Sequence, residues 1–305
     1  MPSSERLRPI RRAIDWGELG PLRLRARLVA EGVYAGLHRS ARRGAGVEFG
    51  GFREYVAGDD LRWLDRRSLL RHERLVVRQF ETETDRDLCL LVDASASMGF
   101  RGPGAPGAKL AYAAVVAAAL ARIALAGGDP VSLTLLGGGE HAHPVPRSSG
   151  REQFERIVAA LESVDAGGDA HMDTGVLERA LQALARGARR GAIVVVLSDL
   201  IDLPPGAAQR IAAVGTGGRV LAVTQVLDPA EAEFPYGGHV RLRALEGGSV
   251  VETDADTARE RYLAAMSELT RGWRDEVVRH GGRFLAATSA EDPVGTVRSI
   301  VESVR

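Results

Sequence analysis

The stretch "LCLLVDASASM", Leu88–Met98, decides the fold, because an apolar run ends there in a group of oxygen-bearing side chains. A continuous apolar run of this length is typical of a strand in a parallel sheet that is covered on both faces. Asp93, Ser95 and Ser97 follow the run at alternate positions. Such a group at a strand end is a helix cap, a nucleophile or one half of a metal site, and the rest of the chain has to distinguish these.

Strand-like and helix-like segments alternate from about residue 85 to the C-terminus. Apolar runs predict strands at 86–93, 130–137, 191–199, 219–228 and 283–289. Helical spacing of apolar residues, with Gly or Pro at the ends, predicts helices at 109–128, 151–164, 173–187, 204–218, 255–282 and 292–305. This alternation predicts an α/β fold with a doubly wound, mostly parallel sheet.

The alternation also predicts the division of the chain. Residues 1–85 lack it and are expected to form an N-terminal module, an α+β extension, while 86–305 form the α/β domain. Within that domain "GGHVRLRALEGGSVVETD" alternates apolar and polar residues around a Glu-Gly-Gly turn. This pattern predicts a β-hairpin inserted near 239–254.

Composition favours a soluble protein without membrane insertion. Forty basic and forty acidic residues cancel, so no overall field favours nucleic acid or a membrane surface. The single cysteine, Cys89, lies in an apolar run and is expected to be buried, which fits a reducing compartment. No signal peptide is recognisable, and the apolar segment Leu110–Ala126 is too weakly hydrophobic for a comfortable span. We therefore expect a cytoplasmic protein.

The arginine-rich segment Arg6–Arg43 is interpreted as a solvated surface with salt bridges to acidic residues of the same chain.

Two further polar clusters are expected at the same edge of the sheet as Asp93. Ligands of open α/β sheets bind at the carboxyl ends of strands, near a topological switch point. "GGDAHMDTG", Gly167–Gly175, enters a helix, and "LSD", Leu197–Asp199, ends the strongest apolar strand. Carboxylates and hydroxyls are the ligands that hard divalent cations prefer. Mg²⁺ is the preferred candidate for this site, ahead of Mn²⁺ and Ca²⁺. His141, His143 and His171 lack zinc-ligand spacing and are expected to be exposed loop residues.

Other strand-end chemistries fit this sequence less well. "GPGAPGAKL" has the glycines and lysine of a phosphate-binding loop, but not its register or the hydroxyl residue after Lys109. No Gly-x-Ser-x-Gly elbow is present. Phosphoaspartyl hydrolases of the haloacid-dehalogenase kind need a second aspartate where this chain has Ser95.

"DASAS" at 93–97, a later threonine and "SD" at 198–199 resemble the metal-ion-dependent adhesion site (MIDAS) of von Willebrand factor A domains. The resemblance covers roughly 86–305 and implies a Rossmann-like fold. It also implies a divalent ion, whose coordination an acidic residue of a partner protein completes. The ligands that it implies are Asp93, Ser95, Ser97, Thr174 and Asp199. In the family the threonine follows paired glycines, whereas here Asp169 does. Thr174 is preferred for this position, with Asp169 and Asp173 as alternatives.

The segment Gly46–Asp85 is similar to the hallmark segment of the domain-of-unknown-function family DUF58, which runs directly into a von Willebrand A domain. This resemblance implies a MoxR-type AAA+ ATPase as partner, and the chain looks like the shorter, soluble kind. One departure is Asp65-Arg66, where the family usually has Asp-Trp.

Together these features predict a non-enzymatic, metal-dependent protein-binding adaptor. It would act with the ATPase on an unknown client protein, in maturation or remodelling. The alternatives are a metal-dependent phosphoesterase or other hydrolase, which would use the same carboxylates to activate water, and a scaffold with a degenerate metal site.

Overall fold

The computed structural model describes residues 13–41, 52–54, 76–78, 86–139, 142–168, 174–245 and 249–304. Contacts divide the chain into a larger unit of 1–33 with 86–305 and a smaller unit of 34–85. The second boundary falls at the predicted end of the N-terminal module, but the segment up to Val33 is grouped with the larger unit. Most of the hallmark segment 46–85 lies outside the described residues. Its strands β1 (Phe52–Glu54) and β2 (Val76–Arg78) pair antiparallel in a sheet of their own.

The larger unit is built on a six-stranded sheet with the order β10-β7-β6-β3-β4-β5. Its strands are β3 (Leu88–Ala94), β4 (Val131–Gly137), β5 (Val145–Ser148), β6 (Ile193–Ser198), β7 (Val220–Leu227) and β10 (Arg283–Thr288). All neighbours are parallel except β4 and β5. The predicted α/β fold with a mostly parallel sheet is thus confirmed.

The strand order places a topological switch point between β3 and β6. The chain runs from β3 outward to β4 and β5, and then returns to β6 on the other side of β3. In doubly wound sheets, the crevice outside the carboxyl ends at such a reversal is where ligands bind. Val92 pairs with Leu197 in register, so Asp93 and Ser198 follow side by side at this crevice.

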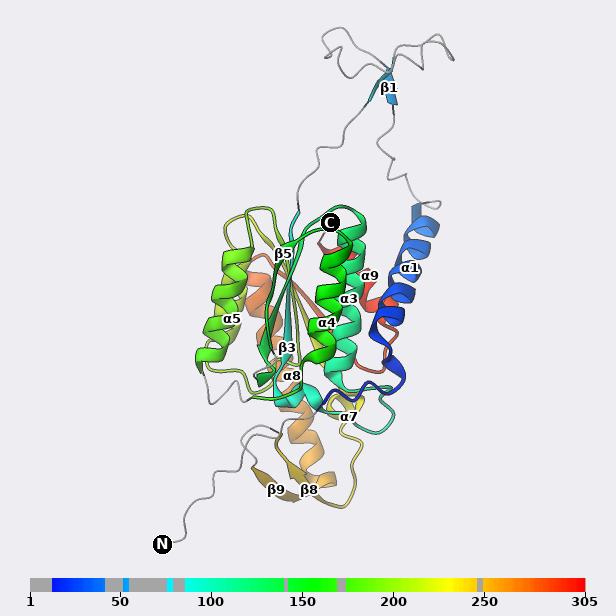
Figure 1. The fold of residues 1–305 in the computed structure, drawn as a ribbon. Helices are drawn as coiled ribbons and strands as arrows, with labels where there is room; N and C mark the ends of the chain where they lie inside the picture. The colour runs from blue at the N-terminus through cyan, green and yellow to red at the C-terminus, as the bar shows by residue number, and fades with distance from the viewer. Residues whose placement is uncertain are drawn as a thin grey trace. The chain divides into compact units, whose positions relative to one another are not determined.

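Helices cover both faces of the sheet (Figure 1). They are α3 (Lys109–Ala126), α4 (Arg151–Ser163), α5 (Thr174–Gly187), α6 (Ala207–Val214), α7 (Pro229–Glu233), α8 (Ala255–Arg279) and α9 (Pro293–Ser303). One core cluster joins α5, α6 and α8 to β3, β6 and β7. It includes Cys89, which is 1% exposed, as the sequence predicts for a buried apolar residue. Because both faces are covered, β3 is buried along its whole length.

Helix α1 (Leu22–Ala41) packs against this unit through a stripe of small and aliphatic residues. The stripe consists of Leu22, Ala26, Val29, Ala30 and Val33, all buried. Gly32 allows a close approach, since a Cβ there would lie 3.0 Å from a methyl group of Val294. On the outer side Arg23 pairs with Glu155 and Arg27 with Glu31. These arginines therefore form the salt bridges within the chain that the sequence predicts.

Helix α3 is the central helix of the core. Of the helices in the described residues, it alone is long and apolar enough to cross a membrane, and 72% of it is buried inside the unit. Its alanines allow the sheet and the neighbouring helices to approach closely. It begins at Lys109, which is fully buried as well.

The predicted hairpin is present as β8 (His239–Arg243) paired antiparallel with β9 (Val250–Asp254). Between Ala255 and Trp273 no residue of α8 is buried. The hairpin and the start of α8, residues 255–265, therefore form a projection, here called the arm, at the end of the unit where α7 lies (Figure 1).

Candidate functional site

The carboxyl end of β3 brings three predicted ligands together in a buried turn. Asp93, Ser95 and Ser97 are 1%, 2% and 8% exposed. The backbone N–H of Ser95 donates to Asp93 Oδ1 at 2.9 Å, and the hydroxyl oxygens of Ser95 and Ser97 lie 3.1 Å apart. Ser95 also precedes the short 3-10 helix η3 (Ala96–Gly99), which ends the strand. The alternating oxygens therefore gather at one point of the switch-point crevice.

The carboxyl end of β6 completes this group from the neighbouring strand. The Ser198 hydroxyl donates to Asp93 Oδ2 at 2.6 Å and accepts from the backbone N–H of Leu200 at 2.9 Å. Asp199, which is fully buried, accepts from the backbone N–H of Ile201 through Oδ1 at 3.0 Å. Leu200 has φ of 62°, which is uncommon for a bulky buried residue. Backbone strain of this kind concentrates at functional sites.

A third segment lies directly against this turn. The backbone N–H of Gly167 donates to the carbonyl of Ala94, and that of Ala96 donates to the carbonyl of Gly168, at 2.9 and 3.2 Å. The paired glycines are thus held beside the predicted ligands.

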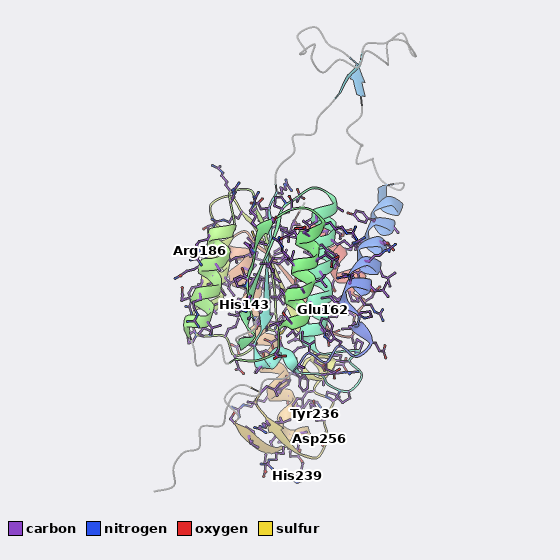
Figure 2. All side chains as sticks on the ribbon, viewed as in Figure 1. His143, Glu162, Arg186, Tyr236, His239 and Asp256 are labelled. Carbon is purple, nitrogen blue, oxygen red and sulfur yellow. The ribbon has the colours of Figure 1, made fainter. Side chains whose placement is uncertain are left out.

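The position of the remaining ligand stays a prediction. Asp169 and Asp173 lie outside the described residues, and for Thr174 only the backbone, at the start of α5, is described. Of the three histidines, His143 is exposed as predicted (Figure 2), and His141 and His171 lie outside the described residues.

Two buried carboxylates, Asp93 and Asp199, lie close enough at this edge for their charges to interact. Burial and, after it, the nearby charge of Asp199 raise the pKa of Asp93 to about 6, against the lowering effect of the hydrogen bonds from Ser198 and Ser95. The described residues contain no cluster of three or more His, Cys, Asp or Glu side chains able to hold an ion. The candidate site instead combines two carboxylates with hydroxyls. This oxygen set fits a hard divalent cation, which would also relieve the repulsion between the carboxylates.

Lys109 is a member of the site that the sequence patterns missed. Its Nζ donates to Asp199 Oδ2 and to Glu231 Oε1, both at 2.7 Å. Burial alone lowers the pKa of this amine, but the two carboxylates outweigh burial and raise it above its usual value, so the group is an ammonium ion. One signal was available, because Lys109 is the only lysine among the 40 Lys and Arg residues of the chain.

Glu231 is held in place by the short helix α7. Asp228 and Glu231 form a capping box, in which each side chain accepts from the backbone at the start of the helix. Asp228 Oδ2 also accepts from the backbone N–H of Gly102 at 2.8 Å. A Cβ on Gly102 would lie 2.3 Å from Asp228 Oδ1, so this approach requires glycine. The Gly- and Pro-rich loop before α3 is thus fastened to the end of β7.

A groove of about 560 Å³ lies on the arm between the hairpin and α8. Its apolar lining includes Phe234, whose ring centroid lies 4.5 Å from that of Tyr262. Its described lining includes two arginines, Arg243 and Arg261, but no acidic residue. Neither arginine forms an ion pair within the described part of the chain. Since Phe234 follows α7, the groove begins close to Glu231. Figure 2 shows Tyr236 on the same projection.

Sequence comparisons identify relatives over most of the chain. A family profile described as "Protein of unknown function DUF58" matches residues 51–271. The "Uncharacterized protein Mb1516" of Mycobacterium bovis is 32% identical over 243 residues, which is 79% of this chain and 74% of that protein.

Solved structures match this chain at low sequence identity and with TM-scores below 0.5. BatB from Bacteroides thetaiotaomicron, a conserved hypothetical protein, is 18% identical with a TM-score of 0.46, over 72% of this chain and 98% of that chain. A von Willebrand factor type A protein from Catenulispora acidiphila is 12% identical with a TM-score of 0.40, over 72% and 42%.

Proposed function

The chain belongs to the DUF58 family, and from the geometry of its sheet edge we propose that it is a non-enzymatic, metal-dependent protein-binding adaptor. One observation carries this proposal. Asp93 and Asp199 lie at the ends of neighbouring strands at the switch point, where both are buried and their charges repel, and the Ser198 hydroxyl donates to Asp93. Such an oxygen cluster has the composition of a Mg²⁺ site.

The ion would be held by Asp93, Ser95, Ser97 and Asp199, directly or through water. The remaining position would be filled by Thr174 or by one of the two neighbouring aspartates, Asp169 and Asp173. Mg²⁺ keeps several of its coordination positions for water or outside oxygens, so a carboxylate of a partner protein can complete the shell. In this role the bound ion coordinates a carboxylate of the partner and does not activate a substrate.

The partner that we propose is a MoxR-type AAA+ ATPase, acting with the adaptor on a client protein in the cytoplasm. The arm supports a protein partner, because its groove combines aromatic and aliphatic walls with two arginines that have no ion pair within the described residues. Apolar grooves rimmed by charge are typical of protein-binding surfaces. We propose that the partner coordinates the metal through one carboxylate and docks further acidic and apolar side chains into this groove.

Removal of the two serine hydroxyls tests the metal site. The double substitution S95A/S97A is expected to weaken Mn²⁺ binding at least about tenfold, because it removes two of the hard oxygen donors. Calorimetric titration with Mn²⁺ measures this directly. Ser163→Ala is the matched control, since its hydroxyl only caps the end of α4 by donating to the carbonyl of Ala160. Equal affinity in the double variant and in wild type would refute the assignment.

Binding to the ATPase tests the adaptor role separately. The MoxR-type ATPase of the same genome should be retained by immobilised wild-type protein in Mg²⁺, and released by chelator or by S95A/S97A. Retention that chelator does not change would contradict metal-dependent binding. Turnover of a phosphoester by the wild type in Mg²⁺ or Mn²⁺, lost in S95A/S97A, would favour the hydrolase instead.

Charge reversal on the arm is expected to weaken the ATPase complex while leaving metal affinity unchanged. R243E/R261E places acidic side chains where the groove carries its two arginines. Such charge reversals act mainly through repulsion of an acidic partner, and a loss of at least about tenfold in affinity is expected. The control R151E/R271E makes the same change of charge at exposed residues outside the groove. Equal losses in both doubles would show a general charge effect and count against the groove.

A further inference from the structure

The only lysine of the chain occupies a position that disfavours a cation in two ways. Lys109 is the first residue of α3, where the helix dipole favours negative charge. It is also 0% exposed, and an isolated buried ammonium is costly. Both penalties are offset chiefly by its ion pairs with Asp199 and Glu231, at 2.7 Å each, since its remaining charge contact in the described part of the chain is the Phe100 ring at 6.0 Å. The position of the lysine is therefore explained by these carboxylates and not by the helix.

In the metal-free protein the carboxylates depend in turn on this ammonium to balance their negative charge. Asp93 and Asp199 are buried, and the Glu231 side chain is only 18% exposed. Lys109 is the only basic side chain that pairs with Asp199 or Glu231 within the described residues. Buried charges without a partner are strongly destabilising. Lys109 thus supplies Asp199 with the positive charge that a bound ion would otherwise provide.

The identity of the residue also follows from this geometry. The ammonium is compact and donates in several directions, so it can reach carboxylates on β6 and α7 at once. This accounts for a lysine here in a chain whose other basic side chains, apart from histidine, are all arginine.

We propose that Lys109 is an internal counter-ion, a positioning residue that keeps Asp199 in place when the metal is absent and lowers the affinity of the site for the metal. The inference rests on the proposed function for the ion itself. Its consequence is that the adaptor stays folded with an empty site. The ion is then bound weakly until a partner's carboxylate adds its own negative charge.

Two variants separate this role from simple structural support. Lys109→Met leaves Asp199 and Glu231 without their cation, so the protein should melt at a lower temperature in chelator. Mg²⁺ should then raise the melting temperature of this variant by about twice as much as that of wild type, because the ion replaces the lost charge. The control Arg147→Met breaks the ion pair with Asp87, away from the site, and should lower stability without gaining in its response to Mg²⁺.

The double variant K109M/E231Q covers the case in which K109M does not fold. It preserves net charge and keeps an amide oxygen to cap α7, but Asp199 has lost its ammonium. It should bind Mn²⁺ about tenfold more tightly than wild type, since Asp199 Oδ2 is no longer paired with an ammonium and is free for the ion. Wild-type protein labelled with ¹⁵Nζ-lysine adds a test without substitution. Its single lysine side-chain signal should shift during Mg²⁺ titration and not during addition of Na⁺.

The outcomes are distinct. Tighter Mn²⁺ binding by the double variant and a shifting lysine signal support the counter-ion role. A double variant that binds Mn²⁺ no more tightly than wild type would overturn this role and leave the proposed function standing. If neither protein binds Mn²⁺, the proposed function itself fails.

Discussion

Asp93→Asn is expected to abolish metal binding and at the same time to stabilise the metal-free protein at neutral and alkaline pH. The pKa of Asp93 is raised from 3.8 to about 6 by burial and by the charge of Asp199. The folded protein therefore holds this proton more tightly than the unfolded chain. The stability contributed by the protonated group is fully present below pH 3.8 and is lost as pH rises through about 6.

The size of this effect follows from linkage. A rise in pKa from 3.8 to about 6 corresponds to up to about 3 kcal/mol of lost stability above pH 6. Asparagine has no charge to bury, and it retains an oxygen for the Ser95 N–H and an amide that can face Ser198. The stability advantage of the variant should therefore grow between about pH 4 and pH 6 and stay constant above. Denaturant unfolding in chelator across this range measures it.

A control lies at the other end of the same strand. Asp87 is also buried, but it is ion-paired with Arg147 at 2.6 Å, so Asp87→Asn should destabilise the protein. In saturating Mn²⁺ wild type should become more stable than Asp93→Asn, since only wild type gains stability from the ion. A variant that is less stable than wild type in chelator at pH 8 would show that the two carboxylates do not repel each other there.

Gly137→Ala is expected to destabilise the protein and to disturb the site, because Gly137 lies between two of its segments. Gly137 has φ of 80°, and a Cβ there would lie 2.9 Å from the backbone N of Ser95 and 3.0 Å from the carbonyl O of Gly167. Both contacts are with backbone atoms, which cannot rotate away. Left-handed strain and overpacking together should cost roughly 3 kcal/mol. Mn²⁺ affinity should fall as well, because Ser95 is displaced.

Gly191→Ala separates the two causes. Gly191 has φ of 86°, but a Cβ there would meet nothing within 4 Å. This variant should show only the conformational cost, about 1 kcal/mol, and full Mn²⁺ affinity. Urea unfolding and Mn²⁺ titration of both variants provide the comparison. Similar losses in stability, with Mn²⁺ affinity unchanged in both, would rule out the tight packing of Gly137 against Ser95 and Gly167.

The sequence patterns predicted the parallel strands and the longer helices because these elements satisfy simple periodic rules. A strand covered on both faces must be apolar throughout, as β3 and β6 are, and a helix on one face must be amphipathic, as α4 is. Strand β5 was missed because it is short, contains Pro146 and owes its conformation to pairing with β4. Helix α7 was missed as well, although Asp228-x-x-Glu231 with Pro229 is a capping-box pattern.

The sequence by itself determined where oxygen-bearing side chains follow buried strands, since strand ends and turns depend on neighbouring residues. It placed Asp93, Ser95 and Ser97 in one turn and Asp199 at another strand end. Only the tertiary structure decided that β3 lies beside β6, because periodicity does not encode the order of strands in a sheet. For the same reason Lys109 emerged only from the fold. Its two partners come from β6 and α7, far along the chain, and burial in a common core is what brings these charges together.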